Sequence, residues 1–196
     1  MKRILILLAT LLAADAAYAE SSSVSLPSTV AGATSATAAL TPLPKRFKIL
    51  LLQGANLSYL GRREPELYGT TSAAELDSML RAHADRRGYD VEIFYTHIEG
   101  EAIERLYRAV DEGFDGVVMN PGGFTYNGYA LRDCLRALPF PYVEVHITNI
   151  DKRGIRSVMA EVAVGIISGF GIDAYVIGLD AMLNHLTQKS GPPSEP

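Results

Sequence analysis

The chain has 196 residues, of which 48% are hydrophobic and 20% are charged, and its formal net charge is −4 at pH 7. This length and composition predict one globular domain with tails. The lack of a basic stripe argues against a nucleic-acid partner, and the single cysteine, Cys134, excludes an intramolecular disulfide.

The first nineteen residues have the pattern of a secretory signal peptide. Lys2 and Arg3 precede the apolar run ILILLATLLAADAA, and AYA at 17–19 has the small residues of a cleavage site. An uncleaved membrane anchor is the alternative, although the run is short for a span and Asp15 interrupts it. We expect export to the periplasm or beyond, with cleavage near Ala19 and no membrane association afterwards.

Residues 20–44 consist mainly of Ser, Ala, Thr and Pro and have no apolar period. Such a segment buries too little apolar surface to offset the entropy of ordering it. We therefore predict a disordered linker over 20–44, one domain over 45–190, and a flexible tail over 191–196.

Apolar runs alternate with helical periodicities from residue 47 onward. In chain order the predicted elements are strand FKILLLQ, helix SAAELDSMLRAHADRRG, strand DVEIFYTH, helix EGEAIERLYRAVDEG, strand GVVMN, helix GYALRDCLRAL, strand PYVEVHI, a strand within VAVGIISGFG, and helix IDAYVIGLDAMLNHL. The expected buried positions of the first two helices are Ala74, Leu76, Met79 and Leu80, and then Ile103, Leu106, Tyr107 and Val110. The alternation predicts an α/β fold, a flavodoxin-like doubly wound domain whose five-stranded parallel sheet lies in a three-layer α/β/α arrangement.

In such folds the ligand binds beyond the carboxyl ends of the strands, so polar residues that follow strands are site candidates. They are Gln53, Asn56 and GRREPELYG after the first strand, NPGGFTYNG after the third, and EVHITN at the fourth. No GxGxxG or P-loop pattern follows the first strand, and no His, Cys or carboxylate cluster has metal-ligand spacing. We therefore expect neither a nucleotide cofactor nor a metal.

Tyr68 and its neighbouring arginines are the most unusual feature of the first loop. Tyrosine has an unperturbed pKa of about 10 and is a poor base at neutral pH, but a nearby cation favours the phenolate. Arg62 and Arg63 are close enough in the sequence to supply that cation. Tyr68 is thus a candidate base for removing a proton from carbon. The alternative is a packed tyrosine ring with solvated arginines.

Glu144 and His146 are two residues apart on one strand and therefore point to the same face. A carboxylate holds a neighbouring imidazole and favours its charged form, so His146 is a candidate proton donor. A histidine satisfied within the sheet is the alternative. The backbone N–H groups of Thr148 and Asn149 could bind a carboxylate. The glycines after Asn120 allow a ligand to approach closely or simply form a turn. The sequence alone assigns no role to Asp133, Cys134, His83, His97 or His185.

Five segments resemble, in order, the motifs of the type II 3-dehydroquinate dehydratases. QGANLSYLGRREPELYG is similar to NGPNLxxLGxREPxxYG, HIEGE to NHEGE, MNPGGFTYNGYALRD to N-P/A-G/A-x-T-H-x-S-x-A-L-R-D, and VEVHITN to VEVHxSN. VAVGIISGFGIDAY resembles the closing strand and helix, so the similarity covers residues 46–187.

The resemblance implies a hydro-lyase that converts 3-dehydroquinate to 3-dehydroshikimate without a cofactor or metal. It implies that Arg63 activates Tyr68 on a mobile lid, and that Tyr68 removes a proton from carbon 2 of the substrate. It further implies that Asn56 holds a water molecule at the enolate. His146, partnered by Glu144, would then protonate the departing hydroxyl in an anti elimination.

The resemblance also implies substrate contacts and an assembly. The implied binding residues are Asn120, Tyr126, the backbone of Ile147 and Thr148, an arginine of the following loop, and Asp133, which would reach a neighbouring subunit's site. Family members are usually dodecamers built from trimers, so a homo-oligomer, either a trimer or a dodecamer, is expected.

The departures from the family motifs lie in the binding shell. Gln53 and Ala55 replace the first asparagine and the proline of NGPN, and Tyr126 replaces a histidine. The segment IDKRGIRSVMAE is shorter than its family counterpart, and Arg156 is the expected substrate-contacting arginine, with Arg153 as the alternative.

An exported enzyme of this kind fits quinate catabolism in the periplasm better than cytosolic aromatic biosynthesis. Two alternatives remain. One is a lyase acting on a related hydroxy-keto ring acid, suggested by Tyr126 and the shorter loop. The other is a non-catalytic ligand-binding paralogue, against which the retention of Arg63 and Tyr68 argues.

Overall fold

Five parallel strands form one sheet in the order β2-β1-β3-β4-β5. The computed structural model describes residues 46–190, so the predicted signal peptide, linker and C-terminal tail lie outside the described residues. The strands are β1 (Lys48–Ala55), β2 (Asp90–Tyr95), β3 (Gly116–Gly122), β4 (Tyr142–His146) and β5 (Gly165–Ser168). This strand order confirms the predicted flavodoxin-like topology.

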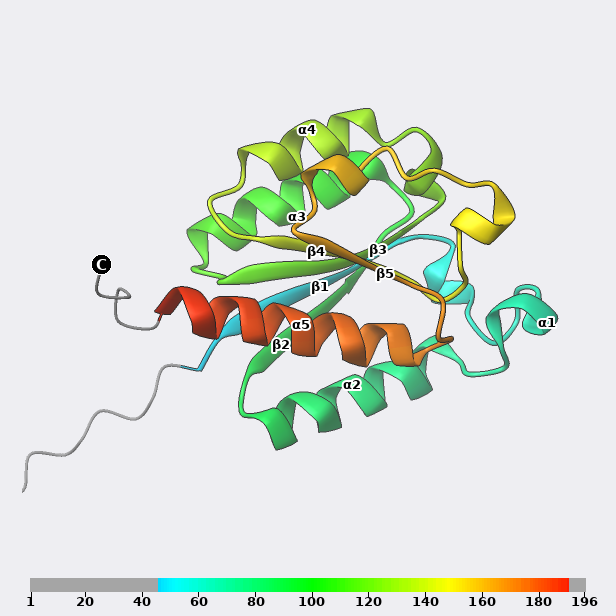
Figure 1. Cartoon of the computed structure of the whole chain (residues 1–196), viewed down its shortest axis with the longest axis horizontal. Helices are drawn as coiled ribbons and strands as arrows, with labels where there is room; N and C mark the ends of the chain where they lie inside the picture. Colours follow the sequence, from blue (N-terminus) through cyan, green and yellow to red (C-terminus); the bar gives the residue numbers. More distant parts are fainter. Residues whose placement is uncertain (1–45, 191–196) are drawn as a thin grey trace, which may run out of the picture. The chain divides into compact units, whose positions relative to one another are not determined.

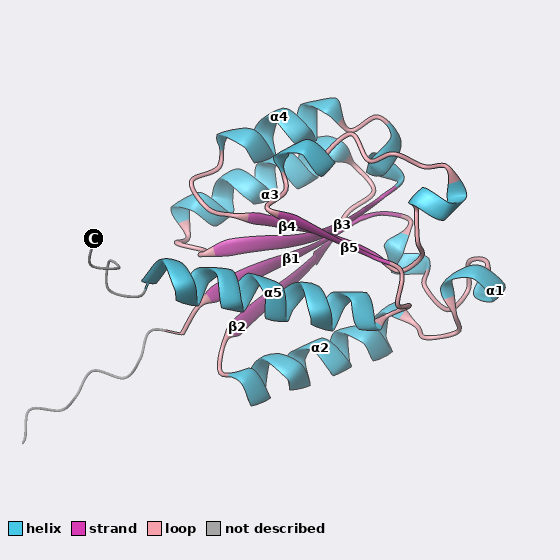
Figure 2. Cartoon of the chain, in the orientation of Figure 1, coloured by secondary structure: helices cyan, strands magenta, loops and turns pink. Residues whose placement is uncertain are grey.

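Helices cover both faces of the sheet, as Figures 1 and 2 show. They are α1 (Pro65–Tyr68), α2 (Ala73–Arg87), α3 (Glu99–Asp111), α4 (Tyr129–Ala137) and α5 (Asp173–Ser190). Helices α2 and α5 lie on one face, and α3 and α4 lie on the other. Between residues 46 and 190 the chain has no helix of the length and hydropathy that crossing a membrane requires.

The apolar run of β1 is continuous because the two faces of the strand belong to different cores. Ile49 and Leu51 pack with residues of α2 and α5, whereas Leu50 and Leu52 pack with residues of α3 and α4. All four leucine and isoleucine side chains are fully buried. A central parallel strand covered on both sides has this pattern. Its buried side chains fix the position of β1 in the sheet, and therefore the point at which the strand ends.

Local signals in the sequence explain where α2 begins and ends. Ser72 and Glu75 form a capping box, in which each side chain accepts a hydrogen bond from the other residue's backbone N–H. Gly88, with φ of 74°, terminates the helix in the left-handed conformation that glycine adopts readily. The helix therefore starts just after the loop that carries Tyr68.

The predicted buried faces of α2 and α3 are partly wrong. Leu76, Leu80 and Leu106 are buried as expected and Ile103 is half-buried, but Ala74, Met79, Tyr107 and Val110 are exposed. In α3 the small residues Ala102 and Ala109 face the sheet instead. Their small side chains share the buried face with Leu106, whereas Tyr107 and Val110 face solvent.

The buried face of α3 also includes a charged residue. Arg105 is only 3% exposed, and its guanidinium pairs with Glu92 on β2 and with Glu112, at 2.6 and 3.0 Å respectively. Burial of an arginine is tolerated when carboxylates satisfy it. A hydrophobicity pattern could not identify this position as part of the core.

Candidate active site

A pocket opens beyond the ends of β1, β3 and β4. Strands β1 and β3 flank the point at which the strand order reverses, where ligands bind in such folds. The predicted site residues that line the pocket are Asn56, Arg63, Tyr68, Asn120, Tyr126, His146, Ile147 and Thr148.

Two glycines allow β1 and β3 to approach closely at the base of the pocket. A Cβ at Gly54 would overlap the backbone oxygen of Pro121, and a Cβ at Gly122 would overlap that of Ala55. Gly122 also has φ of 55°, which side chains of L-residues rarely tolerate. The glycines of the two motifs therefore shape the surface against which a ligand would lie.

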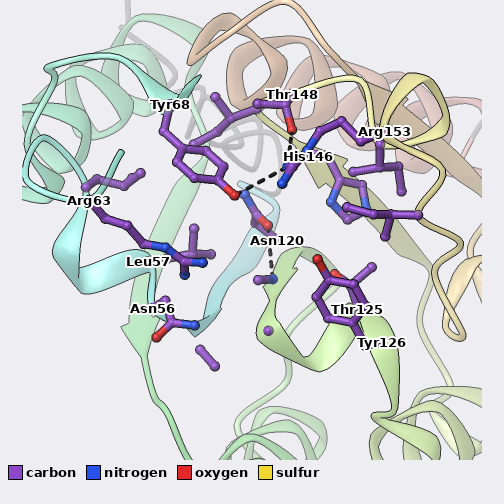
Figure 3. Close-up of a pocket in the computed structure, with 17 residues that line it drawn as sticks. Asn56, Leu57, Arg63, Tyr68, Asn120, Thr125, Tyr126, His146, Thr148 and Arg153 are labelled. Atoms are coloured by element: carbon purple, nitrogen blue, oxygen red, sulfur yellow. Dashed lines mark hydrogen bonds between the residues drawn. The ribbon is translucent and has the colours of Figure 1, made fainter. Parts of the chain in front are cut away.

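Tyr68 ends the short helix α1 and points its hydroxyl into the pocket (Figure 3). Pro65 at the first helical position and Glu64, whose φ of 41° is in the left-handed region, set the course of this turn. The ring of Tyr68 packs against the core beneath α2 and α5. The Tyr68 ring is therefore packed while its hydroxyl faces the pocket. A packed ring and a candidate base are compatible at this position.

Two guanidinium groups lie close to Tyr68. Arg153 donates a hydrogen bond of 3.3 Å to the Tyr68 hydroxyl and one of 3.0 Å to Oγ1 of Thr148 (Figure 3). The Arg63 guanidinium lies 5.6 Å from the centre of the Tyr68 ring, and its Nε pairs with Glu64 at 3.1 Å. The cation in direct contact with the phenol oxygen is therefore Arg153, while Arg63 adds positive charge over the ring.

The geometry does not support the expectation that Arg156 contacts the substrate. Both arginines are exposed, but Arg153 lines the pocket and Arg156 does not. Arg153 ends a single 3-10 turn, Asp151–Arg153, that begins five residues after His146 and turns back toward the pocket. The segment has no periodicity from which this turn could be predicted, so the sequence left both arginines as candidates.

His146 and Glu144 form a buried pair at the end of β4. The His146 Nε2 and a Glu144 carboxylate oxygen are 2.6 Å apart, and Glu144 is completely buried. The other carboxylate oxygen accepts a hydrogen bond of 2.8 Å from the hydroxyl of Tyr142. Burial, together with the adjacent Glu144, raises the pKa of Tyr142 well above its usual value, so Tyr142 remains a neutral donor. Because Nε2 faces Glu144, the pocket side of His146 is left to Nδ1.

Asn56 is held at the pocket edge by a histidine to which the sequence assigned no role. The Asn56 backbone N–H donates to Nδ1 of His97 at 3.0 Å, and Nε2 of His97 lies 2.9 Å from the Ser58 hydroxyl. Since Nδ1 accepts a hydrogen bond, the neutral ring carries its proton on Nε2 and donates it to Ser58. His97 therefore fixes the turn in which Asn56 adopts a φ of 78°.

The remaining predicted residues differ in how close they lie to the pocket. Asn120 is buried, and its Oδ1 accepts a hydrogen bond from the Gly122 N–H at 3.1 Å. Tyr126 lines the pocket and is 58% exposed, next to buried Thr125, which the sequence had not singled out. Asp133 is on α4 outside the pocket, with its exposed side chain 3.4 Å from Arg136. Any contact of Asp133 with a substrate would have to be in another subunit.

The described part of the chain holds no group of three or more His, Cys, Asp or Glu side chains placed to bind a metal ion. The pocket instead combines two phenols, two guanidinium groups, two side-chain amides and an imidazole with a buried carboxylate behind it. These groups suit acid–base chemistry on a small, oxygen-rich anion. The fold and the site thus fit an enzyme of the flavodoxin-like α/β class.

Comparison with known proteins identifies the family. A family model described as class II dehydroquinase matches residues 47–183. The 3-dehydroquinate dehydratase of Thioalkalivibrio sulfidiphilus is 42% identical over 146 residues, which cover 73% of this chain and 99% of that protein. The chain belongs to the class II dehydroquinase family, and this confirms both the predicted resemblance and the predicted enzyme class, a hydro-lyase.

Solved structures agree with this assignment. The crystal structure of the type II dehydroquinase from Butyrivibrio crossotus is similar with a TM-score of 0.68 and 34% identity, covering 70% of this chain and 98% of that one. A 3-dehydroquinate dehydratase-like protein from Bifidobacterium longum is similar with a TM-score of 0.54 and 30% identity, covering 72% of this chain and 98% of that one. These similarities confirm the predicted fold class.

Proposed function

We propose that the protein dehydrates 3-dehydroquinate to 3-dehydroshikimate by an anti elimination through an enolate. The observation that carries the proposal is a single pocket lined by both Tyr68, with Arg153 on its hydroxyl, and His146, with Glu144 behind it. One group is suited to take a proton from carbon and the other to give a proton to oxygen. The similarity to proteins named 3-dehydroquinate dehydratase supports the same substrate.

In the first step Tyr68, as the phenolate, takes a proton from carbon 2 of the substrate. The electron pair of the broken C–H bond moves toward the neighbouring ketone and forms an enolate. Arg153 at the phenol oxygen and Arg63 over the ring place two positive charges next to the base. Asn56, held by His97, is placed at the pocket edge to hold a water molecule against the enolate oxygen.

In the second step the enolate collapses and the bond between carbon 1 and its hydroxyl breaks. Nδ1 of His146 gives a proton to the departing oxygen, so that a water molecule leaves and the ring keeps one new double bond. The Glu144 carboxylate stabilises the imidazolium needed for this donation. We expect Asn120, Tyr126 and the backbone at Ile147 and Thr148 to bind the substrate's hydroxyl and carboxylate groups.

Absorbance of the conjugated enone product tests the proposed activity. We expect purified protein mixed with 3-dehydroquinate to produce a growing enone band, with 3-dehydroshikimate identified by mass spectrometry. An absence of product from a preparation that still binds 3-dehydroquinate by calorimetry would overturn the proposal. Tyr126 lines the pocket where the family motif has histidine, so a related hydroxy-keto ring acid is the second candidate substrate and is assayed in parallel.

The two arginines of the loop after β4 provide a matched test of the site. Arg153→Met removes the charged hydrogen bonds to Tyr68 and Thr148, so we expect kcat/KM to fall by about 10- to 100-fold. Arg156→Met removes the same kind of charge from an exposed position outside the pocket and should leave kcat/KM within about twofold of wild type. Steady-state kinetics of both variants test this prediction. A larger loss of kcat/KM in Arg156→Met than in Arg153→Met would identify Arg156 as the substrate contact.

The sequence also supports proposals on location and assembly. The signal-peptide pattern supports a periplasmic or secreted enzyme, and therefore a role in quinate catabolism rather than aromatic biosynthesis. The exposed position of Asp133 on α4 is compatible with a homo-oligomer, a trimer or a dodecamer, in which it reaches a neighbouring site. Cell fractionation and native mass measurement test these proposals; a cytosolic enzyme or a monomer would contradict them.

A further inference from the structure

A chain of hydrogen bonds leads from Asn120, at the pocket, into the interior of the protein. The Asn120 amide nitrogen donates to the Tyr175 hydroxyl oxygen at 2.9 Å, and that hydroxyl donates to Oε1 of Gln53 at 2.8 Å. The exposed fractions of the three side chains are 4%, 0% and 0%. They come from β3, α5 and β1, and Gln53 and Asn120 are paired positions of neighbouring strands.

The direction of these hydrogen bonds fixes the positions of the amide oxygen and the amide nitrogen of Asn120. Burial raises the pKa of Tyr175 far above its usual value, so the phenol keeps its single proton. That proton is donated to the Gln53 carbonyl oxygen, so the phenol oxygen can only accept from Asn120. The Gly122 N–H, which can only donate, requires the Asn120 oxygen on the opposite side. Both partners impose one orientation, and the second amide N–H of Asn120 remains for a ligand.

We propose that Gln53 and Tyr175 are positioning residues that fix the Asn120 amide for substrate binding. This inference rests on the proposed function, because it assigns Asn120 a substrate hydroxyl as its partner. Gln53 is one of this chain's departures from the family motif, which has an asparagine there. Its longer side chain reaches the Tyr175 hydroxyl, which lies on an element 122 residues further along the sequence.

Loss of the hydrogen bonds among Asn120, Tyr175 and Gln53 should weaken substrate binding and leave the rate of the chemical steps nearly unchanged. The contacts of the base run from Tyr68 to Arg153 and Thr148, and those of the acid run from His146 to Glu144 and Tyr142. Neither set includes Gln53, Tyr175 or Asn120. An interaction made equally with substrate and transition state changes KM and leaves kcat nearly constant. A purely structural role would instead lower stability and change neither constant.

Tyr175→Phe tests the proposal, with Tyr89→Phe as its matched control. Tyr89 is also a buried phenol of the same apolar core and also has a side-chain hydrogen bond, of 2.9 Å to His83, but it lies outside the pocket and outside the Asn120 chain. For Tyr175→Phe we expect KM for 3-dehydroquinate to rise by about tenfold, with kcat within about twofold of wild type. For Tyr89→Phe we expect both constants to stay within about twofold of wild type.

Gln53→Met provides a second variant that removes the acceptor and retains the side chain's approximate length. We expect it to raise KM as Tyr175→Phe does. We expect KM of the double variant to be no higher than that of either single variant, because all three variants interrupt the same series of hydrogen bonds. Unchanged KM in both single variants, with only a lower melting temperature, would overturn the proposal. Additive effects on KM would overturn it as well.

Calorimetry with 3-dehydroshikimate separates this proposal from the proposed function. If wild type has no activity but binds this ligand, and only Tyr175→Phe and Gln53→Met weaken binding, then the proposed function fails and the positioning role holds. If wild type is active and the variants bind as wild type does, the positioning role fails alone. If wild type neither turns over nor binds, both are overturned.

Discussion

Replacing Tyr68 with phenylalanine is expected to lower kcat by about a thousandfold or more while changing ligand affinity by less than about threefold. Phenylalanine retains the ring that packs against the core beneath α2 and α5, and it removes only the oxygen that Arg153 contacts. The fold of the loop should therefore survive, and the base should be lost. Single-turnover absorbance and calorimetry with 3-dehydroshikimate measure the two quantities separately.

Tyr59→Phe is the control for this prediction. Tyr59 is in the same connection after β1 but is 59% exposed and is not among the pocket residues. We expect wild-type kinetics from this variant. If the Tyr68→Phe enzyme retains more than about a tenth of wild-type kcat, the phenol is not the base, because the loss of a general base lowers the rate by far more than about tenfold.

The second large effect is expected at His146. His146→Gln should lower kcat by about 10²- to 10⁴-fold, because the leaving hydroxyl would depart without a proton donor. The substitution also removes the imidazole whose Nε2 lies 2.6 Å from the buried Glu144 carboxylate. A buried carboxylate deprived of its partner destabilises a protein by several kcal/mol, on the order of 3–5, so the melting temperature should fall together with kcat.

A second substitution distinguishes lost chemistry from lost stability. In the double variant His146→Gln, Glu144→Gln the buried position is neutral, so we expect the melting temperature to recover while kcat remains low. Thermal unfolding and steady-state kinetics of the single and double variants provide the comparison. Recovery of kcat together with stability would mean that His146 serves only to satisfy Glu144.

The strands and the strand order could be predicted because their signals are local. Each strand is a short apolar run, and the helical periods between the runs force parallel pairing and a doubly wound sheet. The exposed position of Tyr107 on α3 could not be predicted in this way. Hydrophobicity favours burying a tyrosine rather than Ala102 or Ala109, but the structure buries both alanines together with Leu106 and leaves Tyr107 exposed.

Site residues on strands were easier to locate than site residues on loops. Glu144 and His146 share a face because the side chains of a strand alternate, and the structure places them 2.6 Å apart. The choice between Arg153 and Arg156 depended on one turn after β4 that no periodicity specifies. His97 was missed because its partner is the backbone of Asn56, a contact that leaves no pattern of residue types.

The stereochemistry of proton loss tests the central claim most directly. The substrate would be 3-dehydroquinate carrying deuterium at one or the other of its two positions on carbon 2, with the label in the product measured by mass spectrometry. With Tyr68 and His146 as separate base and acid, the deuterium anti to the departing hydroxyl should be lost to solvent, and the syn deuterium should remain in 3-dehydroshikimate. Loss of the syn deuterium, or loss from both positions, would contradict the account.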